Sequence, residues 1–215
     1  MPTGTWTRLA PERRAAVTTA AEREFAERGF SQGSLNNIAR AAGVSKGSLF
    51  QYFDDKADLF AYLAGLTSLR VRNAMAEVAS KLPWHEDFFG ALRELNIAWV
   101  AYFYDHPMDL ALTAAANLEP DRSTRAAVRD AAAEHYLGML RPLVDLAAET
   151  QQFREGADRE ALLALLLLVI PHIALAPHVV GLDAVMGFEG ATPEKATELA
   201  DRLLAILEAA YARTA

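Results

Sequence analysis

Apolar residues recur along most of this chain at spacings of three and four, the period of a helix that buries one face. Val17, Ala21 and Phe25 form the first such stripe, which stops at Gly29. Glycine favours the left-handed backbone that commonly follows the last turn of a helix. The pattern therefore predicts a first helix over residues 11–28.

The same pattern predicts about nine helices, separated by prolines, glycines and N-capping residues. The expected caps are Ser34, Ser45, Asp55 and Thr192, because their side-chain oxygens can accept from free amides of the first turn. Seven further helices can be placed: over residues 35–41, 46–53, 56–81, 87–105, 123–152 and 158–180, with a last one from Pro193. We expect two domains, residues 1–56 and 57–215.

Composition supports an all-α fold. The 215 residues include 43 alanines and 29 leucines, both good helix formers. The absence of cysteine excludes disulfides and thiolate metal sites. No phosphate-binding loop or catalytic motif occurs, so we expect no cofactor, no metal and no enzymatic activity.

One stretch is long enough to cross a membrane. Residues 161–182 contain no Asp, Glu, Lys or Arg. However, Pro171, His172, Pro177 and His178 interrupt this stretch, and only residues 161–170 are continuously apolar. We predict a buried helix there, no membrane contact and a cytoplasmic protein.

Two short helices, over residues 35–41 and 46–53, are separated by a turn at Gly43. Glycine permits the left-handed backbone of a tight turn, and Ala39 is small enough for two helices to cross closely. The inside of this corner is expected to contain Ile38, Val44 and Leu49. This arrangement is typical of a helix-turn-helix.

The second short helix has an outer face of hydrogen-bonding groups. These are Ser45, Lys46, Ser48, Gln51 and Tyr52, beside a small Gly47. Such groups suit phosphates and base edges in a DNA major groove. From the residues alone, a plain polar surface helix remains the alternative.

The segment resembles the N-terminal signature of TetR-family transcriptional regulators. The matching positions are Ser34, Ile38, Ala39, Ala42, Gly43, Val44, Ser45, Gly47, Leu49, Phe50, Phe53, Lys56 and Leu59. The resemblance covers about residues 11–60, and the rest is similar to the family only in helix number and length.

The resemblance implies a homodimer that binds double-stranded DNA at a palindromic operator. By position, DNA contacts fall on Ser45, Lys46, Ser48, Gln51 and Tyr52, with phosphate contacts at Ser34 and Lys56. One position departs from the family pattern: Phe50 stands where tyrosine is usual, so a hydroxyl contact is lost. Tyr52 carries a hydroxyl that could compensate for it.

Taken over the whole chain, the net charge of −7 argues against a DNA-binding protein. The charge is, however, unevenly distributed along the sequence. Residues 1–60 carry eight Lys or Arg and seven Asp or Glu, whereas residues 61–215 carry thirteen and twenty-one. The acidic excess therefore lies outside the segment that would contact DNA.

The C-terminal part is implied to bind a small, largely apolar effector and to form the dimer through the last two helices. Candidate ligand contacts are Asn96, Trp99, Phe103, Asn117, His135, Met139 and His172, with Tyr102 and Met108 as further candidates. At this spacing an aromatic residue or a methionine is more often an ordinary core residue than a pocket residue, and the same holds for His135. Pro142 and Pro171 deprive the carbonyls of Gly138 and Leu167 of their helix amides, and we expect both prolines to flank the cavity.

The leading interpretation is a repressor that such an effector releases from its operator. One alternative is an all-α carrier or enzyme whose helix-turn-helix pattern is coincidental. A second alternative keeps DNA binding but makes the protein an activator.

Overall fold

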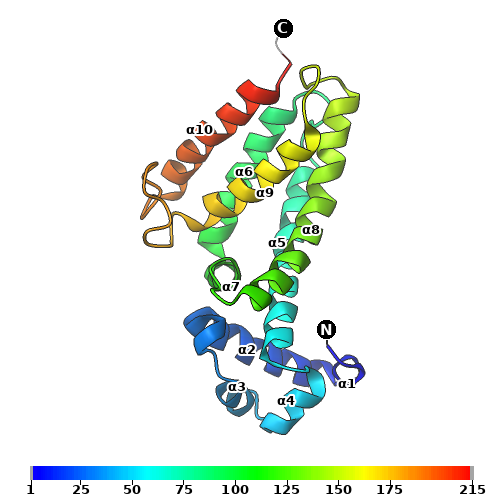
Figure 1. Ribbon diagram of the computed structural model, residues 1–215, viewed down its shortest axis with the longest axis vertical. Coiled ribbons are helices and arrows are strands. Elements are labelled where there is room, and N and C mark those ends of the chain that lie inside the picture. Colours follow the sequence, from blue (N-terminus) through cyan, green and yellow to red (C-terminus); the bar gives the residue numbers. More distant parts are fainter. Residues whose placement is uncertain (1, 214–215) are drawn as a thin grey trace. The chain divides into compact units, whose positions relative to one another are not determined.

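The computed structural model describes residues 2–213, without the side chains of Ala127 and Ala131. The all-α prediction is confirmed, and this part of the chain forms ten helices (Figure 1). They are α1 (Gly4–Thr7), α2 (Pro11–Gln32), α3 (Leu35–Ala41), α4 (Lys46–Tyr52), α5 (Lys56–Ala79), α6 (Phe88–Asp105), α7 (Pro107–Asn117), α8 (Arg122–Glu149), α9 (Arg159–Leu175) and α10 (Pro193–Tyr211).

The helix boundaries follow the local signals of the sequence. The side chains of Ser34, Ser45 and Thr192 accept from the backbone amides three residues later, as expected for N-caps. Asp55 does the same for Asp58 N, at 2.8 Å. Gly29 has φ +66°, so the regular part of α2 ends where predicted, although a short helical turn continues to Gln32.

One predicted boundary needs correction, and two helices were missed. The helix predicted over residues 158–180 ends at Leu175, because Pro177 has no amide with which to continue it. Neither the short helix α1 nor the helix α7 was predicted. Among residues 2–213, no helix has the length and apolar character needed to span a bilayer.

The chain divides into two compact units. Unit 1 contains residues 1–70 and 107–132, and unit 2 contains residues 71–106 and 133–215. This division differs from the predicted one at residue 56, because α7 packs along α2 and so belongs with the N-terminal helices.

Unit 1 has an aromatic core that fixes α2, α4 and α5 together. Phe25 and Phe60 are almost fully buried, and their ring centroids lie 5.0 Å apart. Trp6 of α1 is 3% exposed, with its ring 4.9 Å from that of Phe53. Burying rings of this size is a main source of stability for a small unit.

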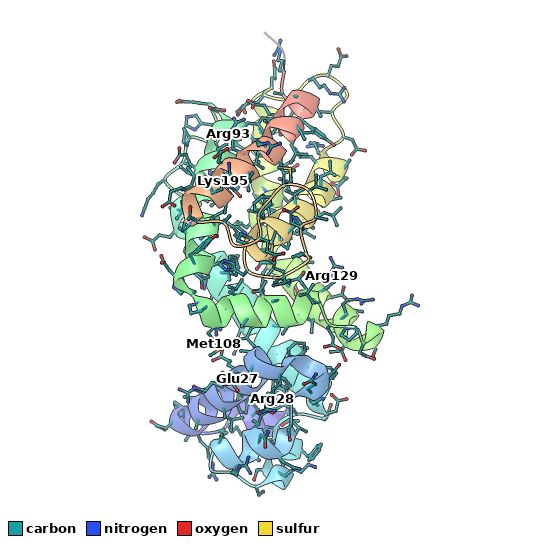
Figure 2. All side chains as sticks on the ribbon, turned by 90° about the vertical axis from the view of Figure 1, so that its left-hand side faces the viewer. Glu27, Arg28, Arg93, Met108, Arg129 and Lys195 are labelled. Carbon is teal, nitrogen blue, oxygen red and sulfur yellow. The ribbon has the colours of Figure 1, made fainter. Side chains whose placement is uncertain are left out.

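Unit 2 is built mainly from α6, α9 and α10, which pack pairwise. On its surface, Arg93 of α6 pairs with Asp201 and Glu208 of α10, each at 2.5 Å. Figure 2 labels Arg93 and Lys195, which come from these two helices. The apolar stretch of α9 supplies much of the core through Leu162, Leu163 and Leu166.

Candidate nucleic-acid interface

Helices α3 and α4 form a tight helical corner in unit 1. Gly43 has φ +66°, the left-handed conformation that the sequence predicts for the turn. Val44 N donates to Ala39 O at 2.9 Å, which closes the corner. Ile38, Ala39 and Leu49 are buried on its inside. The geometry is that of a helix-turn-helix, whose second helix is the one that enters a DNA groove.

The outer face of α4 is open. Ser45, Lys46, Gly47, Phe50 and Gln51 are exposed, and Ser48 is half-buried. Ser45 Oγ and Ser48 Oγ lie 2.9 Å apart and share a hydrogen bond. The structure therefore brings four of the seven predicted contact residues onto one accessible face.

Phe50 belongs to this face, although sequence reasoning noted it only for its missing hydroxyl. Its side chain is 48% exposed, and Lys46 Nζ lies 5.9 Å from the ring centroid. Its ring adds an apolar group to the exposed face of α4, next to the Lys46 side chain. The alternation of Leu49 inward and Phe50 outward was already readable from the helical period.

Tyr52 is buried, although the sequence analysis placed it on the outer face of α4. It is 5% exposed, and its ring packs 5.7 Å from that of Trp6. Thr3 adds two hydrogen bonds here, from its N to Tyr52 O at 2.9 Å and from its Oγ1 to Gln51 O at 2.6 Å. The segment around α1 thus covers the C-terminal end of α4 and takes Tyr52 out of the accessible face.

Lys56 is also engaged within the protein. Its Nζ donates to the carbonyl oxygens of Phe30 at 2.8 Å, Gly33 at 3.2 Å and Ser31 at 3.3 Å. It also lies 4.4 Å above the ring of Phe30. A cation here compensates the carbonyls at the end of α2.

Ser34 is half-buried and turned toward its own helix. Its Oγ accepts from Asn37 N at 3.4 Å, and its backbone N donates to Glu24 Oε1 at 3.0 Å. Whether Ser34, Tyr52 and Lys56 also contact DNA stays a prediction.

An ion-pair network ties α5 to α2 and α7. Arg70 Nη1 lies 2.9 Å from Glu22 Oε1, and Arg70 Nη2 lies 2.5 Å from Asp109 Oδ1. Burial alone would lower the pKa of Arg70, but the hydrogen bonds and charges of Asp109 and Glu22 together raise the pKa above its usual value. Arg70 therefore stays cationic at any physiological pH.

Unit 2 contains an apolar cavity of about 20 Å³. Its lining residues come from α6, α8, α9 and α10: Leu92, Leu95, Asn96, Trp99, Tyr136, Met139, Leu140, Leu167, Ile170, Pro171 and Leu204. Three of the seven predicted ligand contacts, Asn96, Trp99 and Met139, line it together.

The other four predicted ligand contacts do not line this cavity. Phe103 is 1% exposed and packs beside Trp99, while His172 faces Phe188. His135 is half-buried on α8, and Asn117 lies on α7 in unit 1. Of the two helix prolines, Pro171 lines the cavity and Pro142 is exposed and does not.

The last two helices leave apolar side chains uncovered. Leu168 of α9 is 63% exposed and Ile206 of α10 is 66% exposed, with Leu165 of α9 at 37%. Exposed apolar residues gathered on two neighbouring helices are typical of a protein–protein contact.

Comparison with known proteins matches residues 17–63 to the N-terminal domain of "Bacterial regulatory proteins, tetR family". The chain is 36% identical over 88 residues to the HTH-type transcriptional regulator AcrR of Shigella flexneri, covering 41% of this chain and 40% of AcrR. This match thus spans less than half of AcrR. A longer match, 27% identical over 180 residues, covers 81% of this chain and 84% of the HTH-type transcriptional regulator PksA of Bacillus subtilis.

A solved structure extends the similarity to the whole fold. The transcriptional regulator FadR from Bacillus subtilis, in complex with stearoyl-CoA, superimposes with a TM-score of 0.66. The two sequences are 19% identical, over 90% of this chain and 96% of that one. At this identity the similarity shows a shared all-α fold.

Proposed function

Because this chain belongs, through residues 17–63, to the tetR family of bacterial regulatory proteins, we propose that it is a DNA-binding transcriptional repressor. It acts in the cytoplasm, and a small, largely apolar effector releases it from a palindromic operator. The observation that carries this proposal is the open outer face of α4 on a closed helix-turn-helix corner.

In this proposal α4 lies in the major groove. Lys46 binds a phosphate, and Gln51 reads a base edge, since its amide can bond both adenine N6 and N7. Ser45 and Ser48 contribute short hydroxyl contacts, and Phe50 adds an apolar surface next to Lys46. Ser34, Tyr52 and Lys56 serve DNA binding by holding the corner and the ends of α2 and α4 in place.

A palindromic operator requires two copies of the chain. We propose that α9 and α10 form the dimer contact, because Leu165, Leu168 and Ile206 are exposed there. Two recognition helices then have to reach major grooves about 34–36 Å apart. An effector that stabilises a dimer with a different spacing lowers operator affinity by population shift.

The proposed effector site is the cavity of unit 2. Its lining is almost wholly apolar. Stearoyl-CoA, named with the FadR structure, carries several phosphates, and none of the cavity-lining residues here is a cation. We therefore do not extend that ligand to this chain.

Lys46→Ala tests the DNA-binding proposal. With an operator selected from random-sequence DNA by the full-length protein, we expect weaker binding to every sequence. The slope of log K against log[salt] should become shallower by about 0.9, the share of one phosphate contact. Fluorescence anisotropy at several salt concentrations measures both quantities.

Lys195→Ala is the matched control. Lys195 is also a surface lysine, half exposed and paired with Glu198 on α10. It should leave both operator affinity and salt slope unchanged. Equal behaviour of the two variants, or a wild-type protein that binds no DNA, would contradict the proposal.

A further inference from the structure

We propose that the cavity of unit 2 takes an uncharged, mainly hydrocarbon molecule with a single hydroxyl, such as an alkylphenol, and that Asn96 binds this hydroxyl. The inference rests on the proposed function, because it names the chemical class of the effector. It is carried by one side chain and by the charge of the cavity lining.

Asn96 places an amide side chain in the cavity wall. Only 7% of the residue is exposed. Within residues 2–213 its side chain has no hydrogen bond, although it carries two N–H donors and an acceptor oxygen. Since Asn96 lies in the cavity wall, a molecule in the cavity can be the hydrogen-bond partner of its amide.

The rest of the lining is unfavourable for a charged ligand. Eight of the eleven lining residues are Leu, Ile, Met or Pro, and none is Lys, Arg or His. Trp99 Nε1 already donates to Ile170 O at 3.1 Å. A carboxylate or phosphate placed here would lose its hydration without gaining a counter-charge, which is strongly unfavourable. The ligand is therefore neutral.

A hydroxyl suits the site better than an ether or a ketone. It can accept from the Asn96 N–H and donate to a carbonyl at the same time. Asn96 itself offers one carbonyl. The peptide carbonyl of Leu167 is a second acceptor that lacks its usual amide, because residue 171 is proline, and both residues line the cavity.

The cavity has to widen to admit such a molecule. At about 20 Å³ it has room for roughly one water. Met139 lines the wall, and its unbranched side chain can change conformation at low cost. A compact alkylbenzene frame therefore fits the chemistry better than a long acyl chain with a bulky polar head.

The test uses three probes of one shape on the full-length protein: 4-butylphenol, butylbenzene and 4-butylbenzoate. Isothermal calorimetry should give 4-butylphenol about tenfold tighter binding than butylbenzene, the contribution of one hydrogen bond. It should give no measurable binding of 4-butylbenzoate. Equal binding of the phenol and the benzoate, or no binding of either neutral probe, would overturn the inference.

Asn96→Leu and the control Asn117→Leu locate the effect. Leucine fills a similar volume, so the first variant should fold, which circular dichroism and thermal melting would verify. It should remove the advantage of 4-butylphenol over butylbenzene and leave butylbenzene binding intact. Asn117 lies on α7, outside the cavity, so its variant should keep the tenfold ratio. A ratio that survives in Asn96→Leu would contradict the role of Asn96.

Operator affinity, measured on the same protein preparations with and without 4-butylphenol, distinguishes a failure of this inference from a failure of the proposed function. If 4-butylphenol binds through Asn96 but operator affinity does not change, the ligand class stands and effector release fails. If operator binds and none of the probes does, DNA binding stands and the ligand class is wrong.

Discussion

Replacing Trp6 with alanine is expected to lower the free energy of unfolding by about 3–5 kcal/mol, the usual cost of deleting a buried tryptophan. Trp6 is 3% exposed and contacts Tyr52, Phe53 and Tyr62. Its loss removes the cover of the C-terminal end of α4, so operator affinity should fall as well. Urea unfolding and anisotropy with the selected operator measure the two effects.

Trp84→Ala provides the matched control for this prediction. Trp84 is 4% exposed and lies in unit 2, where its Nε1 donates to Ala79 O at 2.8 Å. The control should also lose stability but should keep its operator affinity at temperatures where it is folded. If Trp6→Ala keeps full operator affinity, α1 has no part in holding the recognition helix.

Arg70→Met is expected to destabilise the protein by about 2–3 kcal/mol. The side chain of Asp109 is 8% exposed and that of Glu22 is 16% exposed, so removing the guanidinium leaves two largely buried carboxylates without this cation. The value lies below that of a fully buried pair because the Arg70 side chain is itself 41% exposed. Denaturant unfolding of the full chain measures it.

A double-mutant cycle with Asp109→Asn isolates the interaction. The double variant Arg70→Met/Asp109→Asn should be more stable than the sum of the single losses predicts, because the asparagine needs no cation. Additive losses would show that Arg70 acts through packing alone. Arg141→Met is a suitable comparison, since its pair with Glu160 lies on the surface and should contribute less to stability than the Arg70 network.

Local signals in the sequence predicted much of the fold. Ser34, Ser45 and Thr192 cap helices as expected, and Gly29 and Gly43 adopt positive φ. These features depend on a residue and its neighbours within a few positions, so a sequence pattern contains them. The same holds for the helix-turn-helix corner, which spans fewer than twenty residues.

Contacts between distant parts of the chain could not be predicted in this way. Thr3 donates a hydrogen bond to the carbonyl of Gln51, 48 residues away. No local sequence pattern around Thr3 indicates that partner. For the same reason Tyr52 was expected on the outer face of α4, although its ring is buried by α1. Lys56 shows a related limit, because a lysine at a helix start can bind a phosphate or the protein's own carbonyls equally well.

The cavity was predicted only in part. Asn96, Trp99 and Met139, which were candidates from the sequence, line it. Asn117 and His135 satisfied the same criteria of type and spacing. Asn117 is kept apart because α7 packs on α2 in unit 1. His135 lies on α8 in unit 2, next to the lining residue Tyr136, but does not itself line the cavity.

The two faces of α4 make this domain suitable for redesign. Lys46, Phe50 and Gln51 point outward, whereas Leu49 and Tyr52 are packed inside. A library that varies only the outward positions should yield folded proteins with altered sequence preference. Such a library would explore operator specificity without having to repair the core.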